Sequence, residues 1–74
     1  MTRMMAQAFV SGTVIMAFVD GDAWSVWSLP LEGVTGKKLH SGGASDLANA
    51  KTQARMYFHQ AVKAMQAQGR RDDG

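Results

Sequence analysis

The chain has 74 residues, enough for one small domain whose apolar core is barely sufficient by itself. It contains no cysteine, which excludes a disulfide framework and a cysteine-based zinc site, so self-association or partner binding is a common source of added stability. Apolar residues make up 46% and charged residues 19%, a composition that predicts a folded chain. We therefore expect a single domain over residues 1–74.

The net charge of +2 hides an asymmetry along the chain. Between Lys37 and Arg71 there are seven lysines and arginines against the single acid Asp46. A basic second half favours a partner with an acidic surface or a polyanion, although a solvated helix face has the same composition.

The N-terminal part contains Arg3 and then a moderately apolar run from Ala6 to Val19, features that it shares with a signal peptide. Polar residues and glycine interrupt that run, and Asp20 and Asp22 stand where cleavage would occur. The run is also too short to cross a bilayer. We expect a cytoplasmic protein without membrane contacts.

Residues 1–7, MTRMMAQ, show no clear periodicity and predict a flexible lead-in. The run from Ala8 to Val19 is rich in β-branched and aromatic residues and predicts a strand with a bulge at Gly12. Asp20-Gly21 favours a two-residue hairpin turn, so Ala23 to Leu29 is expected to return as the second strand.

After the turn PLEG, Val34 to His40 predicts a short third strand whose two lysines suit a sheet edge. Ser45 is a good N-cap for a helix from about Asp46 to Gln68, and residues 69–74 form a charged tail. The expected fold class is therefore α+β, with a three-stranded antiparallel sheet (β-β-β-α) packed against one C-terminal helix.

The predicted hairpin is apolar on both faces, whereas a single helix covers only one. Because side chains alternate along a strand, Trp24 and Trp27 point to opposite faces. The only other apolar segment, MTRMMAQ, is short. We therefore expect the face with Trp24, Val26 and Ile15 to be left for a second copy or another protein. The apolar stripe of the helix consists of Leu47, Ala54, Phe58, Ala61 and Met65.

A basic ridge is predicted along one flank of the helix, where four bases recur every four residues. It suits phosphates or an acidic protein, but a solvated helix edge that shields the core looks the same. Lys37 and Lys38 in the third strand complete the basic candidates for partner binding. The ridge consists of Lys51, Arg55, His59 and Lys63.

The sequence contains no convincing catalytic, cofactor or metal motif. The segment GVTGKK lacks the glycine and the serine or threonine of a phosphate loop, because Leu31 and Lys38 occupy those positions. His40 and His59 lack further ligands nearby in sequence, and the acids of the predicted turn lack the rest of a calcium loop. We expect a protein that is not an enzyme and uses no cofactor.

From Asp20 to about Phe58 the chain resembles the N-terminal domain of HicB-like antitoxins. The similar residues are Asp20-Gly21, the strand WSVWS, Leu31 and Gly33 within LPLEG, and Asn49-Ala50-Lys51 followed by Tyr57. The resemblance implies a partial ribonuclease-H-like β-β-β-α fold whose members bind and neutralise a small toxin protein.

These observations predict a small protein-binding module that inhibits or regulates a partner by occlusion, as an antitoxin or an inhibitor from a phage or mobile element does. One alternative is a nucleic-acid-binding β-β-β-α domain that uses the basic ridge. The predicted strands before Lys37 carry no bases and no polar side chains beyond serine and threonine, which argues against reading a DNA groove with the sheet. The other alternative is a structural homodimer.

Overall fold

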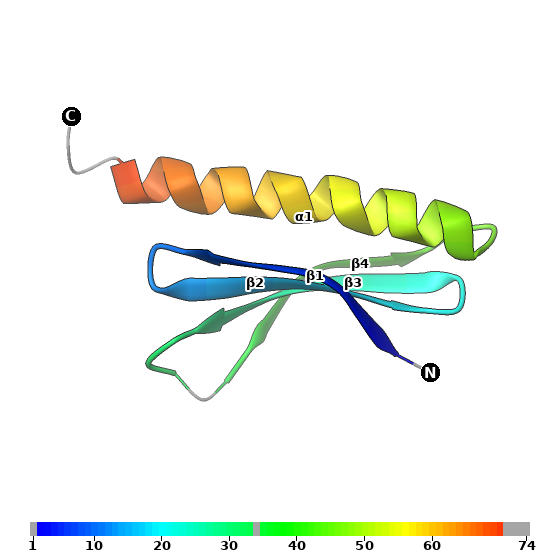
Figure 1. Cartoon of the computed structure of the whole chain (residues 1–74), viewed down its shortest axis with the longest axis horizontal. Helices are drawn as coiled ribbons and strands as arrows, with labels where there is room; N and C mark the ends of the chain where they lie inside the picture. Colours follow the sequence, from blue (N-terminus) through cyan, green and yellow to red (C-terminus); the bar gives the residue numbers. More distant parts are fainter. Residues whose placement is uncertain (1, 34, 71–74) are drawn as a thin grey trace.

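The computed structural model describes residues 2–33 and 35–70 of the chain. It is an α+β fold with one antiparallel sheet of four strands, in the order β1-β2-β3-β4, and one C-terminal helix (Figure 1). The elements are β1 (Arg3–Val10), β2 (Thr13–Asp20), β3 (Ala23–Pro30), β4 (Lys37–Gly43) and α1 (Leu47–Arg70).

The sheet has four strands and not three, because the predicted first strand divides at Ser11-Gly12. Both residues have positive φ, +51° and +73°, which is the pattern of a type I′ two-residue turn. Val10 consequently pairs with Thr13, and Arg3–Val10 forms β1. The predictions of a bulge at Gly12 and of a flexible lead-in are therefore wrong for the described part of that segment.

The hairpin between β2 and β3 turns at Gly21-Asp22, one residue later than predicted. Asp20 pairs with Ala23, and Val19 pairs with Trp24. Gly21 takes the positive φ of +63° that the first position of a type II′ turn requires. Because the loop moves by one residue, each residue of β2 pairs with a residue of β3 two positions later than predicted. A shift of two positions keeps side chains on the same face, so the residues of β2 and β3 that share a face are those predicted.

The second half of the chain begins with β4, which starts and ends three residues later than the predicted third strand. Asp46 is the N-cap of α1, since its Oδ1 accepts a 2.9 Å hydrogen bond from the N–H of Asn49. Ser45, the predicted cap, accepts instead from the side-chain amide of Asn49 at 2.6 Å. The helix continues to Arg70, and residues 71–74 of the predicted tail lie outside the described residues.

The core lies between α1 and one face of the sheet, chiefly over the two central strands (Figure 1). The predicted helix stripe is confirmed at its centre, but Leu47 is 46% exposed. Small alanines on the helix and at Ala17 let the helix approach the sheet closely. Each large apolar side chain buried between them contributes about 1.5–3 kcal/mol to the free energy of folding. The buried cluster consists of Ile15, Ala17, Val19, Trp24, Val26, Ala50, Ala54, Phe58 and Ala61.

Candidate interaction surface

Trp24, predicted to lie on an uncovered face, is buried beneath α1 and only 6% exposed. Its Nε1 donates a 2.9 Å hydrogen bond to Oε1 of Gln53, and its ring stacks on that of Tyr57 with centroids 4.9 Å apart. Val26 and Ile15 are fully buried in the same cluster. The prediction that these three residues form an open surface is therefore wrong, because the helix covers their side of the sheet.

Two residues explain why the helix covers the Trp24 side. Gly42 stands opposite Trp24 on β4, and a Cβ added there would lie 3.1 Å from the indole, so glycine leaves room for the ring. Gln53 supplies the acceptor that a buried indole N–H needs. The ring of His40 extends the aromatic contact, with its centroid 4.8 Å from that of Tyr57.

The opposite side of the sheet, which we call the open face, carries Trp27 and faces away from α1 (Figure 1). Its members follow from the strand registers and from the alternation of side chains. The open face comprises Met4, Gln7, Phe9, Val14, Met16, Phe18, Ser25, Trp27, Leu29, Lys38 and Ser41.

Large apolar side chains dominate the open face and remain in contact with solvent. Phe9 is 69% exposed and Met4 is 52% exposed, whereas Phe18 and Trp27 are half-buried among their neighbours. Val14 is the one buried apolar residue on this side. The side chains shield one another, and within residues 2–33 and 35–70 no other strand or helix covers them.

A shallow groove of ≈ 540 Å³ crosses the open face between Met16, Phe18, Trp27 and Leu29. The Nε1 of Trp27 donates a 3.0 Å hydrogen bond to Oγ of Ser25. Because the indole N–H is thus satisfied within the sheet, the groove offers an incoming group mainly apolar surface.

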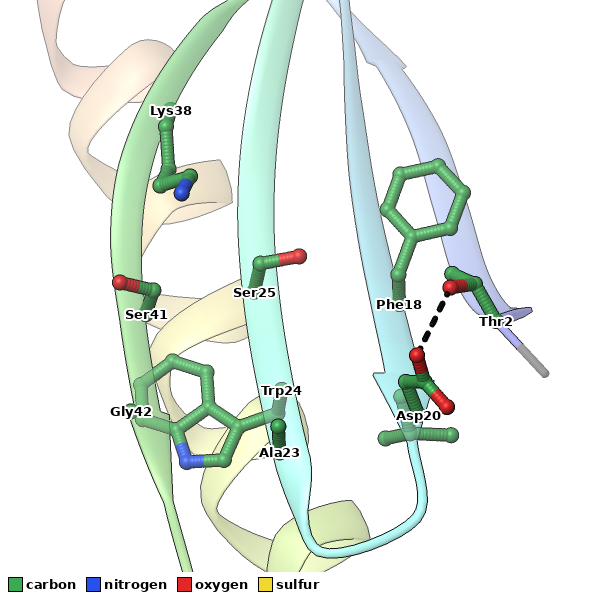
Figure 2. Close-up of a pocket in the computed structure, with 10 residues that line it drawn as sticks. Thr2, Phe18, Asp20, Ala23, Trp24, Ser25, Lys38, Ser41 and Gly42 are labelled. Atoms are coloured by element: carbon green, nitrogen blue, oxygen red, sulfur yellow. Dashed lines mark hydrogen bonds between the residues drawn. The ribbon is translucent and has the colours of Figure 1, made fainter.

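A more polar hollow of ≈ 470 Å³ adjoins this groove and shares Thr2, Phe18 and Ser25 with it (Figure 2). In Figure 2 the side chains of Phe18, Ser25, Lys38 and Ser41 lie over the sheet, with the helix behind. The ammonium of Lys38 is 5.4 Å from the ring centroid of Trp27, a cation–π contact. A cation and two hydroxyl groups therefore border the apolar groove.

Thr2 and Asp20 line this hollow on the side of β2, opposite Lys38 and Ser41 on β4. The Oγ1 of Thr2 donates a 3.2 Å hydrogen bond to the carboxylate of Asp20 (Figure 2). The hollow thus has a basic side on β4 and an acidic side at the end of β2.

The basic ridge is exposed on α1, but the structure does not bring it together with the open face. A four-residue repeat drifts around a helix by about 40° per step, so the ridge winds from the sheet border to the outer side of α1. Its first member, Lys51, lies close to Arg3 and Gly21. All four ridge residues are exposed: Lys51, Arg55, His59 and Lys63.

The two lysines of β4 lie on different sides of the sheet. Lys38 pairs with Trp27 and belongs to the open face, whereas Lys37 pairs with Ser28 on the helix side. Of the bases predicted to contact a partner, Lys38 is therefore the one on the open face.

Sequence reasoning missed Met16, Phe18, Trp27 and Leu29 as a binding surface, although it placed Trp27 on the apolar face opposite Trp24. It assigned that face to the helix. The signals that identify the correct face are Gly42, which makes space for one tryptophan only, and Gln53, a polar residue on the inward side of α1.

The described residues show neither a metal cluster nor a spanning helix. Within residues 2–33 and 35–70, no three His, Cys, Asp or Glu side chains are grouped so that they hold a metal ion. In the same ranges, α1 lacks the apolar character that a helix needs to cross a membrane.

No protein-family model matches this chain, and neither a curated protein nor a solved structure matches it. The resemblance to HicB-like antitoxins therefore stays a prediction.

Proposed function

We propose that this chain is a non-enzymatic protein-binding module that inhibits or regulates a partner protein by occlusion, with the open face as its binding surface. The observation that carries the proposal is the groove between Met16, Phe18, Trp27 and Leu29, which α1 leaves uncovered. Large contiguous apolar patches that polar residues surround mark interaction sites on soluble proteins. Aromatic residues and methionine are also the types enriched at the centres of interfaces.

The ammonium of Lys38 beside the groove favours a partner that presents an apolar side chain next to a carboxylate. The apolar group enters the groove, while the carboxylate reaches the ammonium of Lys38 and the hydroxyl of Ser41. The basic ridge on the opposite side adds a positive field that speeds the approach to an acidic protein at low salt.

Occlusion is the mode of action that suits such a surface. The open face is broad, regular and held by backbone pairing, so it covers a partner's site without a chemical step. An antitoxin-like protein, or an inhibitor that a phage or mobile element directs at a host or defence complex, acts in this way. We place this activity in the cytoplasm.

Capture experiments with matched variants test the proposal. Phe18→Asp puts a charge in the groove, and Met56→Asp puts the same charge on α1, at a methionine that is 49% exposed. Each chain is immobilised and exposed to nuclease-treated lysate of the cells that encode it, and retained proteins are quantified by mass spectrometry. Circular dichroism checks that both variants fold.

We expect the unaltered chain and Met56→Asp to retain one protein in a fixed ratio, and Phe18→Asp to lose it. Equal retention by Phe18→Asp contradicts the assignment of the open face. No retained protein with any of the three chains contradicts the binding function itself.

Nucleic-acid binding is the second candidate function, supported by the composition of α1. The helix contains no aspartate or glutamate from Leu47 to Arg70, and its ridge bases are exposed. Phosphate binding through this ridge falls steeply with salt and ignores sequence. The double variant Arg55→Glu with Lys63→Glu abolishes such binding, whereas Phe18→Asp leaves it unchanged. Salt-insensitive or undetectable duplex binding contradicts this candidate.

A further inference from the structure

The two edges of the sheet, β1 and β4, differ in how well they resist pairing with another strand. β4 begins with Lys37 and Lys38 and has a register shift opposite Val26 and Trp27, whereas the register shift and the one charge of β1 lie within its first residues, Arg3 to Ala6. Charges and irregularities of this kind discourage pairing at an edge. In β1 the segment from Ala6 to Val10 has neither charge nor proline and follows a regular register with β2.

The backbone groups of Gln7 and Phe9 point outward from this unprotected edge. Val10 and Thr13 flank a two-residue turn and exchange backbone hydrogen bonds, and bonded pairs alternate along an antiparallel ladder. Ala8 therefore bonds to β2, whereas the residues on either side of it direct N–H and C=O away from the sheet. The edge thus presents two donors and two acceptors in a regular row.

Two backbone hydrogen bonds at the ends of the other strands show which of their residues bond to the neighbouring strand. The N–H of Leu31 donates to the carbonyl of Gly12 at 2.9 Å, and that of Ala44 donates to Asp22 at 2.8 Å. The second bond assigns His40 and Gly42, on the C-terminal side of the register shift, to the ladder with β3 and leaves the N–H of Ser41 on the outer side.

We propose that β1 pairs antiparallel with β1 of a second copy of this chain, about a two-fold axis normal to the sheet. Outward-pointing residues of both copies then face one another, which places Gln7 opposite Gln7 or Phe9 of the partner copy. Arg3, the single charge of β1, stands at the start of the strand, so an antiparallel pair keeps the two arginines apart.

A second copy fits the β1 edge because, in an antiparallel pair, the outward donors and acceptors of one copy meet those of the other. The lysines of β4 explain why assembly stops at two copies. A head-to-tail contact between β1 and β4 continues into a filament, whereas an isologous pair consumes the β1 edge of both copies. The lysines of β4 disfavour the first arrangement. A closed dimer is what remains.

The dimer joins the two four-stranded sheets into one, with both helices on one side and both open faces on the other. Phe9, 69% exposed in the single chain, then lies near the middle of a continuous apolar surface. This inference depends on the edge alone, so it holds or fails independently of the proposed partner.

Proline substitutions at outward-pointing positions test the pairing. Gln7→Pro removes an outward N–H and leaves the bonds of β1 to β2 in place, because edge strands accept proline where the N–H faces solvent. Ser41→Pro makes the matching change on β4. Mass is measured by light scattering over a concentration series, and amide hydrogen exchange is followed for the unaltered chain.

We expect a dimer for the unaltered chain, for Ser41→Pro and for Phe18→Asp, and a monomer for Gln7→Pro. The amides of Gln7 and Phe9 exchange more slowly as concentration rises. If Gln7→Pro fails to fold, Gln7→Lys replaces it, and the exchange of the unaltered chain decides. A monomer at every concentration overturns the proposal, as does a dimer in which these two amides exchange freely.

Discussion

The indole of Trp24 stacks on the phenol ring of Tyr57, with centroids 4.9 Å apart and ring planes 15° from parallel. Trp24 belongs to β3 and Tyr57 to α1, so this contact joins sheet and helix. The hydrogen bond from Trp24 to Gln53 acts between the same two elements. Together these contacts hold the helix on one face and leave Trp27 on the other.

The two tryptophans are expected to differ sharply in their contribution to stability. Trp24→Ala removes a buried ring and lowers the free energy of unfolding by about 3–5 kcal/mol, most of what a domain of this size has. Trp27→Ala costs less, since its ring is half-buried on the open face. Urea denaturation of both variants measures the difference, and equal losses contradict the assignment of faces.

The close approach of Gly42 to Trp24 predicts a position-specific effect of alanine. A Cβ at Gly42 lies 3.1–3.3 Å from three indole atoms, so Gly42→Ala is expected to lower the free energy of unfolding by about 1–3 kcal/mol. Gly43→Ala is the control, because the nearest atom to its added Cβ is 3.9 Å away. Thermal denaturation should show a loss for the first variant only; the reverse order speaks against the packing of Trp24.

The turn between β1 and β2 offers a stabilising substitution. Ser11 has φ of +51°, a conformation that asparagine tolerates better than serine. Ser11→Asn is expected to raise the free energy of unfolding by up to about 1 kcal/mol, whereas the β-branched Ser11→Val lowers it. A stability unchanged or ranked the other way argues against the first hairpin.

The helix N-terminus predicts which of two neighbouring side chains matters more. Asp46→Ala removes the acceptor for the N–H of Asn49 and should cost about 1 kcal/mol. Ser45→Ala removes only a bond to the side chain of Asn49 and should cost less. Chemical denaturation of the two variants gives the ranking, and a larger loss at Ser45 identifies it as the cap.

Local patterns predicted the helix, the second hairpin and the division of the β2 and β3 residues into two faces, because each depends on short-range spacing. The first hairpin was not predictable with the same ease. Ser11-Gly12 is a weaker turn signal than Asn-Gly, and the β-branched residues around it read as one continuous strand. A strand at Arg3–Val10 also lacks a clean alternation, since a register shift separates Met4 from Ala6.

The pattern of apolar residues does not identify which face the helix covers, because both faces of β2 and β3 are apolar. The choice depends on contacts between residues far apart in sequence. Gly42 and Gln53 both complement Trp24, and neither has a comparable relation to Trp27 in the described residues. The prediction of the binding surface was wrong for the same reason, because it took the Trp24 face to be the one that the helix leaves uncovered.

The central claim is that Trp27, and not Trp24, meets the partner. Its most direct test is fluorine NMR of the chain labelled with 5-fluorotryptophan, in which Trp27→Phe assigns the two signals. The solvent isotope shift between H₂O and D₂O reports the exposure of each ring, in the free chain and with the captured partner bound. We predict a sizeable shift for Trp27 that disappears in the complex, and a small, unchanged shift for Trp24. A Trp27 signal that keeps its solvent shift in the complex would contradict the account.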